Sequence, residues 1–397
     1  MKVLIIDVNC KHSSTGKIVY DLYTQLKKTS HKVRVCYGRG SLVKEPDIYK
    51  FSSNIEVYFH ALLTRLTGLT GIYSHFATRR LLKLIEEFNP DVVHIHELHA
   101  YFVNITPLMN YLKQKNIKTI WTFHCEFMYT GKCGHAYECE KWKTECNHCP
   151  KLHDYPSSLF LDFTKQMFYS KRRMFQNFNN LIIVTPSQWL ADRVRASFLK
   201  DKDIQVIHNG IDINVFCPRE FKHLREKYNL TDEKIVLAVA PNLMSESKGG
   251  HWILELAKRF KNENVKFLLI GVDDLTKDYD DNVIALGKKS NQIELAEYYS
   301  LADVVILANK KETFSLVCAE SLSCGTPVIG FDAGAPSEVA PKGYGIFVEY
   351  GNIDELTEVF KDFLNGKINF NSSNELIEYA QRNYSKEVMF NNYFNIY

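Results

Sequence analysis

The chain opens with KVLIIDVNCKHSSTGKIVYDLYTQLKK (2–28), which sets its fold class. The apolar run at 2–8 predicts a buried strand, and the helical spacing at 18–28 predicts an amphipathic helix after a loop. The same rhythm continues through the first half of the chain, in HKVRVCYG (31–38), LLKLIEEF (81–88), NPDVVHIH (89–96), KTIWTFH (118–124) and NNLIIVTPS (179–187). Short apolar strands that alternate with helices indicate parallel βα units, and hence a Rossmann-like α/β domain.

The rhythm stops at QVIHNGIDINVFCP (205–218), which has no periodicity and contains Asn-Gly and a proline, as an interdomain connection would. It restarts in KIVLAVAP (234–241), KFLLIG (266–271), NVIALG (282–287), DVVILA (303–308) and TPVIGF (326–331). The sequence therefore predicts two Rossmann-like domains, 1–205 and 206–375, that face a central cleft. A helical tail, 376–397, is expected to return to the first domain. Parallel sheets bind ligands at the carboxyl ends of their strands, so the site is expected in the cleft.

Composition supports a two-domain cytoplasmic protein. The chain has 397 residues, 45% of them hydrophobic, which is too long for one ordinary core. No apolar run approaches the roughly 20 residues that a bilayer requires, and the N-terminus is too brief for a signal peptide. In the cytoplasm the ten cysteines would be reduced thiols or metal ligands rather than disulfides.

Charge is distributed unevenly along the chain. Residues 1–208 carry 29 Lys and Arg against 18 Asp and Glu, whereas residues 209–397 carry 20 against 28. The basic half could meet an anionic membrane surface, a lipid pyrophosphate or nucleic acid, or could simply have a basic surface.

The segment ETFSLVCAESLSCGTPVIGFDAGAPSE (312–338) carries the strongest chemical signal. Glu312 and Glu320 stand eight residues apart across a loop-to-helix transition, and Cys324 and Gly325 end the helix. A loop that enters a helix offers free N–H groups and the positive end of the helix dipole to a diphosphate. The two carboxylates could then hold hydroxyl groups on either side of that diphosphate.

This segment resembles the Glu-x7-Glu signature of family 4 retaining glycosyltransferases, and the resemblance covers nearly the whole chain. It is similar to bacterial members that assemble colanic acid and other extracellular polysaccharides. The resemblance implies a GT-B fold, with Glu320 on the ribose hydroxyls of the donor and Glu312 on the donor sugar. It also implies that the backbone of Phe314, Ser315, Leu316 and Val317 approaches the phosphates; Ser315 stands where the family often has glycine.

Lys248, before a helix in APNLMSESKGGHWILELA (240–257), could neutralise the leaving diphosphate. The family usually adds an upstream arginine, where this chain has Asn242. In the first loop, Thr15 and Gly16 let the backbone approach a sugar or phosphate and resemble the family's glycine-rich loop. His124 resembles the histidine that contacts the donor sugar at the cleft edge.

Three more histidines lie near the ends of these strands. His94 and His96 alternate along one strand and face the same side, so one of them could be a core residue. His96 and Glu97, at the strand end, could reach the cleft. His208 is expected to orient the linker.

A cysteine cluster follows His124. Cys133, Cys139, Cys146 and Cys149 could form a four-thiolate structural zinc site in a loop beside the acceptor, although their spacing departs from paired CxxC motifs. Free thiols or disulfides are the alternatives. Next comes an aromatic and basic stretch (157–178), which predicts either a helix packed on the first domain or one that docks on an anionic bilayer.

The sequence thus predicts a retaining hexosyltransferase that moves a hexose from a UDP- or GDP-sugar to a polysaccharide or lipid-linked oligosaccharide. The implied catalytic residues are Glu312, His124 and Lys248, with no metal required for catalysis and no nucleic-acid partner. The enzyme is expected in the cytoplasm, at the inner face of the membrane if the bilayer interpretation holds. A sugar-nucleotide epimerase of similar fold and a non-catalytic nucleotide-sugar-binding subunit are the alternatives, because fold alone does not define function.

Overall fold

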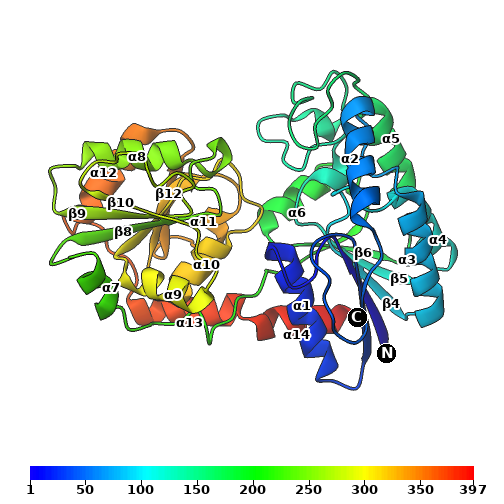
Figure 1. Cartoon of the computed structure of the whole chain (residues 1–397), viewed down its shortest axis with the longest axis horizontal. Helices are drawn as coiled ribbons and strands as arrows, with labels where there is room; N and C mark the ends of the chain where they lie inside the picture. Colours follow the sequence, from blue (N-terminus) through cyan, green and yellow to red (C-terminus); the bar gives the residue numbers. More distant parts are fainter. The chain divides into compact units, whose positions relative to one another are not determined.

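A computed structural model describes residues 1–397, the whole chain. The chain forms two compact units: unit 1 comprises Met1–Ile207 and Phe390–Tyr397, and unit 2 comprises His208–Met389. Figure 1 shows each unit as a sheet covered by helices. The predicted boundary at 205/206 lies two residues before the observed division at 207/208.

Unit 1 is built on a seven-stranded sheet with the order β3-β2-β1-β4-β5-β6-β7, parallel throughout. Its strands are β1 (Lys2–Asp7), β2 (Lys32–Tyr37), β3 (Ile48–Lys50), β4 (Val92–Ile95), β5 (Lys118–Thr122), β6 (Leu181–Thr185) and β7 (Asp203–Val206). The central strands β1 and β4 are almost completely buried, since helices cover both faces of the sheet. Asp7 is the last residue of β1, and His96 and His124 follow the ends of β4 and β5. These three residues thus lie at the carboxyl ends of neighbouring strands.

The helices of unit 1 are α1 (Ser14–Lys27), α2 (Asn54–Thr67), α3 (His75–Phe88), α4 (Ile105–Gln114), α5 (Thr164–Phe175) and α6 (Gln188–Arg195). Two 3₁₀ turns, Phe127–Tyr129 and Lys141–Lys143, occur in the cysteine-containing loop. The chain ends in α14 (Lys386–Ile396), whose last turn packs on the central strands. There the Tyr393 hydroxyl lies 2.8 Å from the Thr122 hydroxyl, and the Tyr397 hydroxyl 2.8 Å from His94 Nδ1.

Unit 2 has a six-stranded parallel sheet with the order β10-β9-β8-β11-β12-β13. Its strands are β8 (Lys234–Val239), β9 (Val265–Ile270), β10 (Val283–Leu286), β11 (Val304–Leu307), β12 (Val328–Asp332) and β13 (Gly345–Glu349). Its helices are α7 (Lys222–Lys227), α8 (Gly250–Arg259), α9 (Gln292–Leu301), α10 (Leu316–Ser323), α11 (Pro336–Val339), α12 (Ile353–Leu364) and α13 (Ser373–Tyr384), with a 3₁₀ turn at Glu246–Lys248. Alternate β8 residues enter two separate cores, Ile235 and Leu237 on one face and Val236 and Ala238 on the other.

The predicted pair of parallel α/β sheets is confirmed, and two local predictions are wrong. The tail is not one helix: Ser385 adopts an extended conformation between α13 and α14, because Ile211 pairs with the backbone there through bonds of 2.7 and 3.1 Å. Strand β7 was not predicted, and its last two residues, Gln205 and Val206, fall in the stretch interpreted as the connection. It is a partly exposed edge strand, and so lacks the apolar run that identifies a central one. No helix combines the length and the apolar character needed to cross a bilayer.

Candidate active site

An ion pair joins two of the predicted residues in unit 2. Lys248 Nζ lies 2.8 Å from Glu312 Oε1, and the side-chain amide of Asn309 donates to the same oxygen. The main chain of Glu312 is fixed as well, since its N–H donates to Ala333 and its carbonyl accepts from Ala335. The two charged side chains remain 30% and 22% exposed, so a ligand can reach them.

Two glycines allow the loops that carry this pair to approach their neighbours. Gly249 has φ 71°, and a Cβ there would lie 2.0 Å from the Ala308 carbonyl oxygen. Gly334 has φ 113°, and a Cβ there would lie 2.2 Å from the Glu312 carbonyl oxygen. Both positions require glycine for space and for conformation. Lys248 and Glu312 are thus held together at the carboxyl end of the sheet by backbone contacts.

The N-terminus of α10 follows Glu312 closely in the chain. Ser315 caps the helix: its hydroxyl accepts the Cys318 N–H at 3.3 Å. Phe314 is buried and packs near His208 and Tyr384. Leu316 and Val317 supply the first-turn N–H groups, which have no intrahelical acceptor. Unpaired N–H groups at the start of a helix are a typical binding site for phosphate.

Glu320 lies one turn further along α10. Its Oε2 accepts a hydrogen bond of 3.0 Å from the hydroxyl of Tyr299, a residue of α9. Burial, together with the Glu320 charge, raises the pKa of Tyr299 well above its usual range, so this phenol remains a donor. Glu320 is therefore oriented by a fixed hydroxyl group.

The predicted donor residue Asn242 stands apart from this pair. It is exposed in the loop after β8, and its carbonyl accepts the Ser245 N–H at 3.0 Å. It makes no hydrogen bond to Lys248 or Glu312. Asn242 thus adds no contact to the pair.

In unit 1, three histidine rings form a connected row. The ring centroids of His94 and His96 lie 4.2 Å apart, so the predicted common side is confirmed, and His96 Nδ1 lies 2.9 Å from His124 Nε2. His94 is bonded through both nitrogens, to Tyr397 and Thr122, and burial lowers its pKa to about 3. It is a neutral core residue. Burial also lowers the pKa of His124, although the charge of Glu97 opposes this effect.

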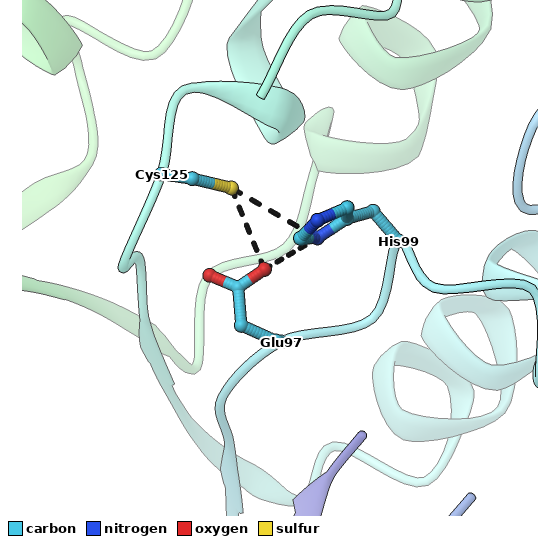
Figure 2. Close-up of side chains that lie close together, drawn as sticks. All are labelled: Glu97, His99 and Cys125. Carbon is cyan, nitrogen blue, oxygen red and sulfur yellow. Dashed lines mark hydrogen bonds and ion pairs between the residues drawn. The ribbon is translucent and has the colours of Figure 1, made fainter. Parts of the chain in front are cut away.

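Glu97, His99 and Cys125 form a second cluster beside this row (Figure 2). His99 Nδ1 is paired with Glu97 Oε2, and the Cys125 thiol lies 3.4 Å from the same oxygen. Burial alone would raise the pKa of Glu97, but contacts with His99 and hydrogen bonds lower it to about 2. Glu97 is thus a buried carboxylate charge whose partners are supplied by the protein.

Asp7 joins Thr15 to these strand ends. Its carboxyl accepts the Glu97 N–H at 3.0 Å, the Asn9 N–H at 3.1 Å and the Thr15 hydroxyl at 3.1 Å. Burial raises the pKa of Asp7 to about 7 despite these bonds. Gly16 is the third residue of α1, and a Cβ there would lie 3.2 Å from the Asn9 Cβ.

Sequence reasoning missed Asp7, Asn309 and Tyr299. Asp7 and Asn309 had a signal, because each stands at the carboxyl end of a predicted strand, where ligand-binding groups gather in parallel sheets. Tyr299 had none, since its contact with Glu320 depends on how α9 packs against α10.

The four cysteines of the predicted zinc site line one small cavity with Gly131 and Trp142. None of the four is in a disulfide. The following stretch forms α5, whose Met167, Phe168, Met174 and Phe175 are buried. This burial favours the packed-helix interpretation of residues 157–178.

Comparison with known proteins identifies the class. The model described as Glycosyltransferase Family 4 matches residues 15–215, and the model described as Glycosyl transferases group 1 matches residues 220–383. WcaC of Escherichia coli (strain K12), a putative colanic acid biosynthesis glycosyl transferase, is 25% identical over 416 residues, which cover 100% of this chain and 99% of the relative.

Solved structures agree on the fold. Sucrose-phosphate synthase from Thermosynechococcus elongatus has a TM-score of 0.70 at 15% identity, covering 100% of this chain and 98% of that one. Anabaena HepE in complex with UDP has a TM-score of 0.69 at 14% identity, covering 100% and 99%. The chain, with its two parallel α/β sheets, thus has the GT-B fold.

The chain belongs to glycosyltransferase family 4, a family of retaining hexosyltransferases. Its donor is a nucleotide sugar.

Proposed function

We propose that this enzyme transfers a hexose, with retention, from a UDP- or GDP-sugar to a polysaccharide or lipid-linked oligosaccharide during synthesis of a cell-surface polysaccharide. The observation that carries the proposal is the contact between Lys248 and Glu312, close in the chain to the start of α10. The name of the relative WcaC supports the polysaccharide acceptor, and the UDP complex of HepE supports a uridine donor.

Each group of the site has a chemical task in this proposal. The first-turn amides of α10 hold the diphosphate, and Lys248 turns from Glu312 to the phosphates when donor binds. Glu312, released from that ion pair, accepts hydrogen bonds from the donor sugar. Glu320, oriented by Tyr299, accepts them from the ribose hydroxyls.

The reaction then follows from charge placement. As the bond between the sugar and the diphosphate breaks, negative charge grows on the leaving phosphate, where Lys248 and the helix amides stabilise it. The acceptor hydroxyl attacks from the same face, and the departing phosphate takes its proton. His124 contacts the donor sugar, while Asp7 holds Thr15 and the strand ends in place.

A nucleotide screen tests the donor site. We expect one diphosphate among UDP, GDP, ADP, CDP and dTDP to raise the melting temperature, and the matching sugar nucleotide to be hydrolysed slowly without acceptor. Hydrolysis should be lost in Glu312→Gln and retained in the control Glu358→Gln, whose side chain is 71% exposed on α12.

Product analysis in the same assay separates the alternatives. An epimerised donor without release of diphosphate would point to the epimerase. Binding with neither hydrolysis nor transfer would point to the non-catalytic subunit.

We also propose that Cys133, Cys139, Cys146 and Cys149 bind a structural zinc ion. They are among the residues that line a cavity of about 20 Å³, and the Gly131 N–H donates to Cys146 Sγ at 3.1 Å, as main-chain amides do to thiolates. Four thiolates are a common zinc ligand set.

Two buried lysine side chains lie next to the cluster. Burial lowers the pKa of Lys171 to about 7 and also lowers that of Lys132, and a negatively charged metal cluster would favour their ammonium forms, which would offset its charge. Lys132 and Lys171 each donate to three main-chain carbonyl groups, and neither pairs with a carboxylate. A zinc ion with four thiolates is a dianion, so the two lysines would balance it.

Mass spectrometry of the native protein should find one zinc per chain, absent in Cys146→Ser/Cys149→Ser and present in Cys217→Ser. A chelator should lower the melting temperature of the wild type. A native protein that contains no zinc, and whose melting temperature is the same with and without the chelator, would contradict the proposal.

A further inference from the structure

Three potential metal ligands from two segments of unit 1 point toward one another (Figure 2). Glu97 and His99 lie in the loop after β4, and Cys125 lies three residues after the end of β5. One carboxylate oxygen, one ring nitrogen and the sulfur all lie within 4.8 Å of one another. Because β4 and β5 are parallel neighbours, the two segments leave the sheet at the same edge.

The distances between these atoms are close to those of a tetrahedral metal site. The Cys125 sulfur lies 3.4 Å from Glu97 Oε2 and 3.9 Å from His99 Nδ1. A zinc ion with bonds of about 2.3 Å to sulfur and about 2.0–2.2 Å to nitrogen and oxygen would place each of these pairs about 3.5 Å apart. His99 Nδ1 and Glu97 Oε2 are in direct contact. A metal ion would take the place of the proton between them and move the two atoms apart.

The pattern of contacts favours a metal site over a catalytic triad. In a triad of nucleophile, histidine and carboxylate, the two partners bind opposite nitrogens of the imidazole ring, so that each nitrogen has its own task. Here the sulfur and the carboxylate both approach His99 at Nδ1, and the sulfur also approaches the same carboxylate oxygen. Three lone-pair donors that meet at one point are the arrangement that a cation requires.

Other contacts hold both segments in place. The Glu97 N–H donates to the Asp7 carboxyl at 3.0 Å, which fixes the loop after β4. In the segment after β5, the Glu126 carboxylate accepts hydrogen bonds of 2.7 Å from Arg193 Nε and 2.6 Å from the Ala136 N–H. Ligands on segments that are already fixed lose little conformational freedom when a metal binds.

A small cavity touches all three ligand residues. Its volume is about 10 Å³, close to what one water-sized ligand requires, and its lining also includes His96, Phe127 and Met128. His96 Nε2 is buried and has no hydrogen-bond partner, so the lining contains a polar group that the fold leaves unused. Zinc sites with three protein ligands keep a fourth position for water or another small ligand.

We propose that Glu97, His99 and Cys125 bind an exchangeable divalent transition-metal ion, with zinc as the best match. A thiolate, an imidazole and a carboxylate are all common zinc ligands, whereas magnesium and calcium prefer oxygen ligands alone. Three protein ligands hold a metal less tightly than the four thiolates proposed above, and the contact between His99 and Glu97 must be broken. We therefore expect the purified protein to keep only the four-thiolate zinc, and this site to fill when metal is added.

The ion would join two segments that carry residues of the active site. His96 directly precedes Glu97, His124 directly precedes Cys125, and His96 Nδ1 lies 2.9 Å from His124 Nε2. A metal that ties the two segments together would restrict the movement of these two rings. The inference is independent of the proposed hexosyl transfer, because metal uptake is measured without donor or acceptor.

Titration of the full chain with cobalt tests the site, because Co²⁺ bound by a thiolate absorbs in the near ultraviolet. We expect one cobalt per chain beyond the zinc already present, with this absorption band, and displacement of the cobalt by added zinc. Cys125→Ser and His99→Gln should each weaken cobalt binding at least about tenfold, since loss of an outer-shell partner alone costs about 10–100-fold. The control Cys217→Ser removes a free thiol of unit 2 and should bind cobalt like the wild type.

Melting temperatures complete the test. Added zinc should raise the melting temperature of the wild type but not that of Cys125→Ser or His99→Gln. If Cys125→Ser does not fold, His99→Gln decides alone, and cobalt affinity equal to that of the wild type would overturn the proposal. A wild type without the absorption band would overturn it as well. A band that is kept in Cys125→Ser and lost in Cys146→Ser/Cys149→Ser would assign the cobalt to the four-thiolate cluster instead.

Discussion

The two groups of polar residues at the sheet edges differ in how their charges are satisfied. In unit 2, Lys248 and Glu312 neutralise each other while remaining partly exposed. In unit 1, Asp7 and Glu97 are buried and His124 is half-buried, and burial together with neighbouring protein groups shifts the pKa values of all three. An exposed ion pair can exchange one partner for a charged ligand at little cost, whereas a buried network resists change. Unit 2 is therefore suited to bind a charged donor, and unit 1 to hold fixed groups in position.

The largest effect is expected from Glu312→Gln. The variant keeps the size of the side chain but removes its charge, and with it the strongest acceptor for the sugar hydroxyls. We expect kcat to fall about 10²–10³-fold, the range seen when one preorganised group is lost from a charge-stabilising site. Steady-state kinetics with the cognate donor checks this, with Glu358→Gln as the control; activity within twofold of the wild type would remove Glu312 from the site.

His124→Ala tests whether the fixed groups of unit 1 contribute to catalysis. We expect a loss of about 10–100-fold in kcat, because the variant removes a fixed hydrogen-bonding group and leaves His96 without its ring partner. His31→Ala, which also removes a ring from unit 1, should leave kcat unchanged. If both variants lose activity equally, His124 contributes only to folding.

Much of the fold could be predicted from the sequence, because buried parallel strands are continuous apolar runs, as in 2–8 and 234–241. Edge strand β7 could not, because it lacks that pattern. In the site, Glu312 and Lys248 could be proposed as partners in function, but their direct contact depends on the loops that Gly249 and Gly334 allow. The hydrogen bond between Tyr299 and Glu320 could not be predicted from the sequence, because it depends on how α9 packs against α10.

A smaller effect is expected from Tyr299→Phe. This variant removes only the hydroxyl that orients Glu320 and keeps the buried ring. A hydrogen bond to a charged group contributes about 1.5–3 kcal/mol, and only part of this orienting contact is expected to appear in donor affinity. We therefore expect the KM of the donor to rise about 3–30-fold, or about 0.7–2 kcal/mol, with little change in kcat. A fall in kcat at constant KM would show that Glu320 acts elsewhere.

Asp7→Asn should affect stability more than activity. The folded-state pKa of Asp7 is raised to about 7, so its contribution to stability is complete below the unfolded-state pKa near 3.8 and is lost as pH rises towards 7. The wild type should thus lose about 1–4 kcal/mol relative to Asp7→Asn between pH 4.5 and 8. Urea unfolding of both proteins across this range checks it; parallel curves would show that Asp7 does not titrate there.

The exchange of Lys248 from Glu312 to the donor diphosphate is the central claim. Calorimetric titration of wild type and Lys248→Ala with the diphosphate chosen by the nucleotide screen tests it most directly, with Lys361→Ala as the control. We predict binding at least about tenfold weaker in Lys248→Ala, because one charge-assisted contact to phosphate is lost. Equal affinity of the two proteins would contradict the account, since the diphosphate would then bind without Lys248.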